Sequence, residues 1–77
     1  MLLNKARKRV ISDAVIRLRE VRGVIETVRD DELNAMENVP ENLQESERYS
    51  SMEDAVDIMD DTIDNLDDII SALDDIA

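Results

Sequence analysis

The apolar residues of the chain recur at helical spacing in two long segments that a polar connection separates. In the first segment, steps of three and four residues place one set of apolar side chains on a single helix face. This set, a predicted packing seam, is Ile11, Ala14, Leu18, Val21, Ile25 and Val28. The periodicity predicts a helix over about residues 3–37, in which Val10, Val15 and Val24 widen the apolar stripe.

The second segment carries an unbroken heptad series. Its apolar residues step alternately by four and three, the 3.5-residue repeat that is typical of a left-handed coiled coil. The predicted seam is Met52, Val56, Met59, Ile63, Leu66, Ile70 and Leu73. Ser50 and Glu53 form a capping-box pattern near its start, so we predict a helix over about residues 51–77.

Residues 38–49 are predicted to connect the two helices. Pro40 cannot continue a helix and favours an extended conformation for the residue before it. Pro40 also suits the first position of a short helical turn through Gln44. We expect Leu43 and Tyr49 to cover the open end of the hairpin.

Two helices of similar length with a proline-containing connection predict an all-α fold, an antiparallel coiled-coil-like hairpin within a single domain, residues 1–77. A core of this size rarely supplies more than about 3–5 kcal/mol without a disulfide, a metal or a partner. Ala55, Thr62, Ile69 and Ile76 widen the second seam enough for it to contact more than one helix. We therefore expect a homodimer, a four-helix bundle. For Gly23, a close approach of another backbone is favoured over a hinge.

The charge is divided between the two arms. Residues 1–29 carry eight basic and three acidic residues, a net of +5, whereas residues 30–77 carry one basic and seventeen acidic residues, a net of −16. The basic segment 1–29 and the acidic segment 30–77 attract each other. Because segment 30–77 keeps a large excess of acidic residues, we expect its partner to be a basic protein surface. Direct binding of nucleic acid is not expected, because the basic segment at residues 5–9 is short and has no interleaved aromatic residues.

A dense row of carboxylates is predicted on the second helix, opposite its seam. The row contains nine Asp and one Glu, although Asp is the poorer helix former and like charges on one face repel. We expect this row to be a partner-binding acidic face. Its members are Glu53, Asp54, Asp57, Asp60, Asp61, Asp64, Asp67, Asp68, Asp74 and Asp75.

Three interpretations of the acidic face stay open. It is a solvated surface that pairs with the first helix or keeps the protein soluble. Alternatively, it imitates the phosphates of DNA and occupies a basic groove. Four helical residues rise about 6 Å, which is comparable to the spacing of phosphates along one nucleic-acid strand. Adaptation to a high-salt host also favours acidic surfaces.

No catalytic, cofactor or metal site is predicted, and we expect no enzyme activity. The chain has no Cys and no His, so it lacks thiolate ligands and the commonest general acid–base. The segment 57–68 has no glycine and does not fit an EF-hand loop. Met1-Leu2-Leu3 is too short for a signal-peptide core, and no run is long enough to span a membrane.

The connection carries a distinctive motif. Residues 39–48 read Val-Pro-Glu-Asn-Leu-Gln-Glu-Ser-Glu-Arg, and residues 52–57 read Met-Glu-Asp-Ala-Val-Asp. These stretches resemble a group of small, acidic helical proteins of Gram-positive phages and mobile elements. The resemblance covers the connection and the second helix, roughly half of the chain. It implies a protein in the cytoplasm of a bacterial host, and a setting in which small acidic proteins counter host defences.

The sequence thus favours a non-enzymatic interaction protein. In this hypothesis the acidic helix binds a basic surface of a nucleic-acid-binding or defence protein, as a DNA-mimic inhibitor such as an anti-CRISPR or anti-restriction protein. The alternative hypothesis is a structural, scaffolding homo-oligomer in which the acids only provide solubility.

Overall fold

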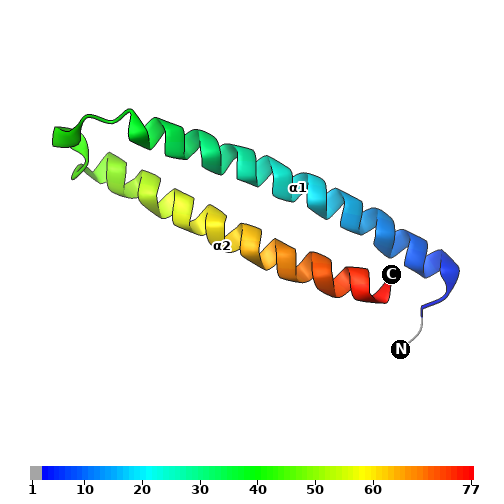
Figure 1. Ribbon diagram of the computed structural model, residues 1–77. Coiled ribbons are helices and arrows are strands. Elements are labelled where there is room, and N and C mark those ends of the chain that lie inside the picture. The colour runs from blue at the N-terminus through cyan, green and yellow to red at the C-terminus, as the bar shows by residue number, and fades with distance from the viewer. Residues whose placement is uncertain (1–2) are drawn as a thin grey trace.

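The structure, a computed structural model that describes residues 3–77, is a helical hairpin (Figure 1). Helix α1 spans Lys5–Glu37, a short 3-10 helix η1 spans Glu41–Leu43, and helix α2 spans Glu47–Ile76. The two long helices run antiparallel and pack along their length, and residues 3–77 contain no strand. The predicted all-α two-helix hairpin is confirmed.

Side-chain caps set where the helices begin. Asn4 precedes α1, and its side-chain oxygen accepts a hydrogen bond from the Arg7 backbone N–H at 2.9 Å. Ser46 caps α2 in the same way, accepting from the Tyr49 N–H at 3.2 Å. The predicted capping box of Ser50 and Glu53 is wrong, because Ser46 offers the same cap one turn earlier. Ser50 lies inside α2, and its N–H donates to the Ser46 carbonyl at 3.1 Å.

The seam of α2 is the one that the heptad series predicted. Val56, Ile63 and Ile70 lie seven residues apart and are buried. Flanking them, Met52, Met59, Leu66 and Leu73 are half-buried. This half of the interface follows directly from the 3.5-residue repeat.

The seam of α1 differs from the prediction. Ile11, Ala14, Leu18 and Ile25 are half-buried as expected. Val21 and Val28, however, are 50% and 49% exposed. The column that faces α2 instead runs through buried Val15. At seven-residue steps it continues through Arg22 and Arg29, which form ion pairs with α2. The apolar stripe of α1 is wide enough to allow either rotation of the helix, so its periodicity alone could not choose between them.

The hairpin is a single layer of two helices, 59 × 17 × 13 Å. Arg29 pairs with Asp60 and Arg22 with Asp67, so seven residues along α1 match seven residues backward along α2. This register places the last turn of α2 opposite Asp13 and leaves the first two turns of α1 projecting beyond it, as Figure 1 shows. Within residues 3–77, neither helix is apolar over a long enough stretch to cross a membrane.

Gly23 lies on the outside of α1. A Cβ atom built there would meet nothing within 4 Å, so the hairpin itself contains no close backbone approach at this position. The favoured explanation of Gly23 is therefore not supported within one chain. The Thr27 hydroxyl donates a hydrogen bond to the Gly23 carbonyl at 3.0 Å.

Candidate protein-interaction surfaces

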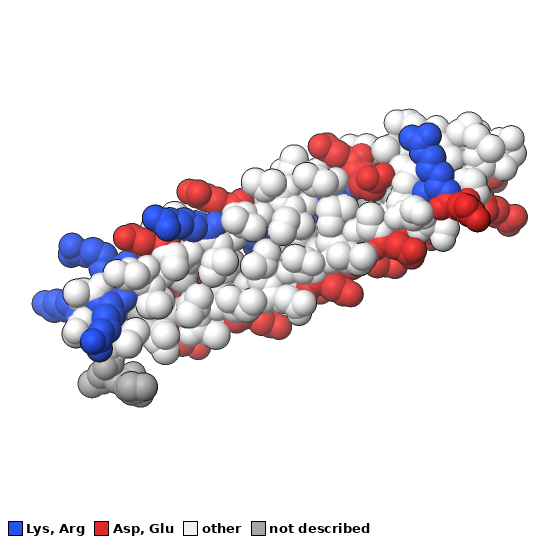
Figure 2. Space-filling model, turned by 180° about the vertical axis from the view of Figure 1, so that it is seen from behind, with Lys and Arg blue, Asp and Glu red and all other residues white. Residues whose placement is uncertain are grey.

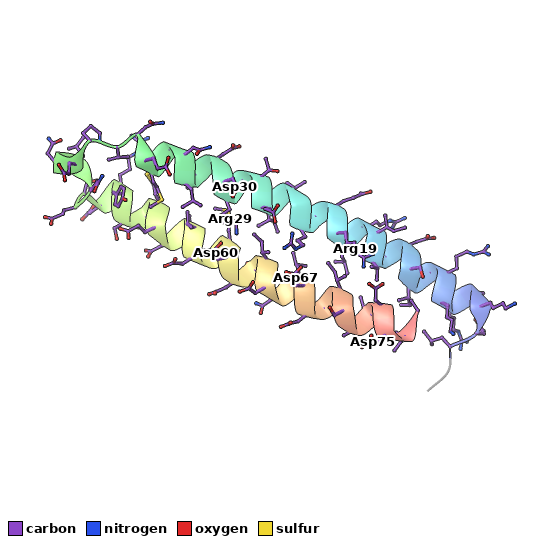
Figure 3. All side chains as sticks on the ribbon, in the orientation of Figure 1. Arg19, Arg29, Asp30, Asp60, Asp67 and Asp75 are labelled. Carbon is purple, nitrogen blue, oxygen red and sulfur yellow. The ribbon has the colours of Figure 1, made fainter. Side chains whose placement is uncertain are left out.

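The carboxylates of α2 divide into two sets, and the first set faces α1. Three aspartates at seven-residue spacing flank the buried seam and pair with arginines of α1; Figure 3 shows the side chains between the helices. These pairs, called here the ladder, are Arg29–Asp60, Arg22–Asp67 and Arg19–Asp74. The sequence had placed all three aspartates on the outward acidic face. They pair with α1 instead, because each lies one residue closer to the seam than the aspartate that follows it in the chain.

Arg22 is the centre of the ladder. Its Nε donates to Asp67 Oδ1 at 2.5 Å and its Nη2 to Asp67 Oδ2 at 3.2 Å, the forked arrangement that suits a carboxylate. Its Nη1 donates to Glu26 Oε2 at 2.8 Å. The hydrogen bond to Asp67, and next the one to Glu26, raise the pKa of Arg22 above its ordinary value. The guanidinium therefore keeps its charge throughout the neutral range.

Arg29 repeats this arrangement one heptad nearer the connection. Its Nη1 donates to Asp60 Oδ1 at 2.9 Å and its Nε to Asp30 Oδ1 at 3.2 Å. The hydrogen bond to Asp60, followed by that to Asp30, raises the pKa of Arg29. A raised arginine pKa stabilises the folded chain below the ordinary arginine pKa, and the effect is lost only as the pH rises through the folded value.

A signal for the ladder is present in the sequence. Arg22 and Arg29 are seven residues apart, and so are Asp60, Asp67 and Asp74. In an antiparallel pair of helices, two such series run alongside each other. The apolar periodicity alone does not reveal that the arginine and aspartate series match. An arginine can take a place in the seam, because its alkyl stem packs along the seam while its charge stays at the edge.

The second set of carboxylates lies on the outer side of α2. Its members follow steps of three and four residues, with Ser71 in the one remaining place, and all are exposed. In Figure 3, Asp75 lies on the side of α2 away from α1. Glu53 is exposed near the start of the row. This set, called here the aspartate stripe, is Asp54, Asp57, Asp61, Asp64, Asp68 and Asp75.

The aspartate stripe is long, straight and unneutralised. None of its members forms an ion pair with another residue in the described part of the chain. At about 1.5 Å per residue the stripe extends about 30 Å, so its charges have a mean spacing of about 6 Å. One strand of DNA carries a charge about every 3.4 Å of its axis, so the stripe has roughly half of that charge density. Among residues 3–77, no three acidic side chains converge closely enough to hold a metal ion.

A second surface lies on the side of the hairpin opposite the ladder. There, large apolar side chains from both helices remain about half exposed. Figure 2 shows a band of uncharged residues running along this side, with carboxylates at its edges. We call this surface the apolar face; its large side chains are Val10, Val21, Val24, Val28, Ile69 and Ile76.

The two ends of the hairpin have opposite charge. The projecting turns of α1 carry Lys5, Arg7, Lys8 and Arg9, and no ion pair within residues 3–77 involves them. The end that holds the connection is strongly acidic. The molecule is therefore a charged rod, basic at one end and acidic at the other and along one edge.

The connection end contains a groove of about 460 Å³. Leu43 and Tyr49, predicted to cover this end, line the groove rather than filling it. Leu43 is 49% exposed. The other lining residues are Ala35, Asn38, Val39, Pro40, Ser46, Arg48 and Met52.

Comparisons of the chain with known protein families, with curated proteins and with solved structures gave no match.

Proposed function

We propose that this chain is a non-enzymatic binding protein whose aspartate stripe occupies a basic, nucleic-acid-binding surface of another protein, as a DNA mimic. One observation carries the proposal. Six exposed carboxylates follow one line on α2, and the arginines of α1 neutralise none of them. A partner with a row of cations supplies what the hairpin itself does not.

The stripe has a cost that packing does not explain. Like charges three or four residues apart each destabilise a helix by about 0.2–0.5 kcal/mol. Asp is also a weak helix former. Pairing with the first helix accounts for the ladder aspartates and leaves the stripe without a structural role. Retaining the stripe is understandable if its charges bind a target.

The resemblance of the connection to small phage proteins suggests the kind of target. In that setting the partner is a defence protein of a bacterial host, such as a CRISPR or restriction nuclease, and the site of action is the host cytoplasm. The DNA groove of such a protein is lined by Lys and Arg. Binding of this kind is steered by charge and weakens steeply as salt rises.

The proposal is tested by capture from a bacterial lysate on the immobilised full chain, with elution by a salt gradient. We expect a DNA-binding protein to elute with salt, and the free chain to compete with DNA for the purified protein. Replacing Asp57, Asp61, Asp64 and Asp68 with Asn should abolish both effects. The matched control replaces Glu37, Glu41, Glu45 and Glu47 with Gln, which removes the same amount of charge away from the stripe. Equal loss in both variants would mean that net charge, and not the stripe, is responsible.

A second function is favoured by the apolar face. In this alternative, the chain is a scaffolding homo-oligomer, and the stripe only keeps the assembly soluble. It predicts that the stripe variant behaves like the unaltered chain in every assay, whereas Leu66→Asp disrupts the assembly. Capture of a basic protein that the stripe variant no longer binds would exclude this alternative as the whole function.

A further inference from the structure

The hairpin exposes more surface than a compact protein of its mass. The accessible surface is 6021 Å² for 8.8 kDa. A compact monomer of this mass exposes about 4,800 Å², so the excess is about 1,200 Å². A specific interface buries about 800 Å² on each partner. Stable domains also have at least two packed layers, and this structure has one. The excess is therefore sufficient for one complete interface.

The α1 side of the apolar face is self-complementary when reversed. Reversal about the position of Val24, to within half a residue, sets residues of the same kind or of opposite charge against each other. Val21 and Val28 match, Ala14 and Ala35 match, and Arg17 is mirrored by Asp31. Neither Arg17 nor Asp31 forms an ion pair within residues 3–77. An interface between two identical copies about a twofold axis requires this kind of symmetry.

The α2 side has the same property about a point midway between Asn65 and Leu66. Reversal places Thr62 against Ile69, and Ala55 against Ile76, so that a small residue meets a large one at each level. Such alternation lets two layers interdigitate. The register of the ladder sets Val24 of α1 opposite residue 65 of α2, next to Leu66. The two centres of symmetry therefore lie within about one residue of each other along the hairpin.

The charges of the two ends select the orientation. Residues 5–19 together with 70–77 form one end, with six basic and three acidic residues. Residues 30–57 form the other end, with ten acidic residues and one basic residue. Two hairpins laid in the same direction bring the acidic ends together. Two hairpins laid in opposite directions bring each basic end against an acidic end.

We propose that the apolar face binds a second copy of this chain in the opposite direction, about a twofold axis through Val24 and Leu66. Helix α1 packs on α1 of the second copy, and α2 packs on α2. Val24 then meets its own counterpart, and Arg17 pairs with Asp31 of the second copy at two symmetric places. The result is a four-helix bundle in which every neighbouring pair of helices is antiparallel.

This arrangement has a consequence that rests on the proposed function. Both aspartate stripes come to lie along one edge of the dimer and run in opposite directions, as the two strands of duplex DNA do. Together they carry about one charge every 3 Å, compared with about 1.7 Å for the duplex. The dimer does not depend on this consequence, since its interface contains no residue of the stripe.

The mass in solution is the first test. Sedimentation equilibrium of the full chain should give twice 8.8 kDa. Val24→Asp should give a folded or partly folded monomer, because it puts a charge on the axis. Ile16→Asp is the matched control: Ile16 is 54% exposed on the other side of α1, and its variant should stay dimeric. A monomer of unaltered sequence at ~100 μM, about a hundred times a micromolar Kd, or equal effects of both variants, overturns the proposal.

Orientation is tested with single cysteines, since the chain has none of its own. A short thiol-specific crosslinker should join two copies of Val24→Cys in high yield. Val10→Cys is equally exposed in the same column of α1, but in the proposed dimer it lies about 40 Å from its counterpart and should not be joined. Joining of Val10→Cys, or failure of Val24→Cys in a dimer of the right mass, contradicts the antiparallel arrangement.

Exchanging charges tests the symmetric pairs. Arg17→Asp and Asp31→Arg each replace two attractive pairs by two repulsive ones and should weaken dimerisation about tenfold. The double variant restores both pairs in reversed form and should recover the affinity of the unaltered chain. If the double variant is as weak as the two single effects combined, Arg17 does not meet Asp31 of a second copy. Each of these outcomes can occur whether or not the stripe binds a basic partner.

Discussion

Helix α2 contains three Asp-Asp dipeptides, and the two members of each lie in different environments. Asp60, Asp67 and Asp74 come first in their dipeptides and pair with arginines of α1. Asp61, Asp68 and Asp75 come second and belong to the exposed stripe. Consecutive residues of an α-helix point about 100° apart, since 3.6 residues complete a turn. The same residue type is thus directed inward to the ladder or outward to solvent by one step along the chain.

This difference teaches that composition does not assign a role to an acidic residue. The ladder aspartates have a structural explanation, because each finishes an ion pair across the hairpin. The stripe aspartates form no such pair within residues 3–77, and they repel one another. The ladder therefore belongs to the scaffold that positions the stripe.

The largest loss of stability is expected when an aspartate is placed in the buried seam of α2, rather than in the ladder or the stripe. Ile63 is 4% exposed, and Ile63→Asp buries a carboxylate without a partner. We expect a loss of about 4 kcal/mol or more, enough to unfold a hairpin of this size. Circular dichroism at 222 nm during heating measures the loss. Ile58→Asp is the control, since Ile58 is 66% exposed, and its melting curve should change little.

Neutralising the stripe is expected to stabilise the fold. Replacing Asp57, Asp61, Asp64 and Asp68 with Asn removes repulsion between neighbouring carboxylates, so the free energy of unfolding should rise by about 1–2 kcal/mol at low salt. Urea denaturation at low salt measures the gain. At 1 M salt the gain should nearly vanish, because the Debye length falls to about 3 Å. A loss of stability would show that the stripe has a structural role after all.

Gly23→Ala gives a reference change in the free energy of unfolding, with which the effects of the ladder and stripe variants can be compared. It alters neither set of aspartates. The position is helical, lies outside the seam and has no neighbour within 4 Å of an added Cβ. Alanine should therefore raise the free energy of unfolding by about 1 kcal/mol. Destabilisation would indicate that another backbone approaches Gly23 in the assembly. Chemical denaturation over a range of protein concentrations separates the two results.

The smallest effects are expected at the central Asp-Asp dipeptide, Asp67-Asp68. Asp67→Asn breaks the forked pair with Arg22 and should lower the melting temperature by about 2–4 °C at low salt. Asp68→Asn makes the identical chemical change one residue later and should leave the melting temperature unchanged or raise it. Differential scanning calorimetry of the two variants measures the opposite signs. Equal shifts would mean that the ladder contributes no more than an exposed carboxylate.

Several elements were predictable from local chemistry. Pro40 ended the first helix, and the heptad series of α2 gave Val56, Ile63 and Ile70 as its buried centre. Two features were predicted wrongly. The cap of α2 is Ser46 and not Ser50, because two serines offer the same local chemistry one turn apart. The rotation of α1 also differed, because Val21, Val24 and Val28 extend its apolar stripe beyond the part that one neighbouring helix covers.

By itself, the sequence determined that the chain forms two amphipathic helices with opposite charge and a turn between them. These properties depend on residues close together in the chain, through periodicity, capping and the geometry of proline. Only the tertiary structure decided which column of α1 faces α2, and therefore which aspartates pair with arginines and which stay exposed without an ion pair in residues 3–77. That choice depends on contacts between residues about 30 to 55 positions apart, where small rotations of a helix exchange one set of partners for another.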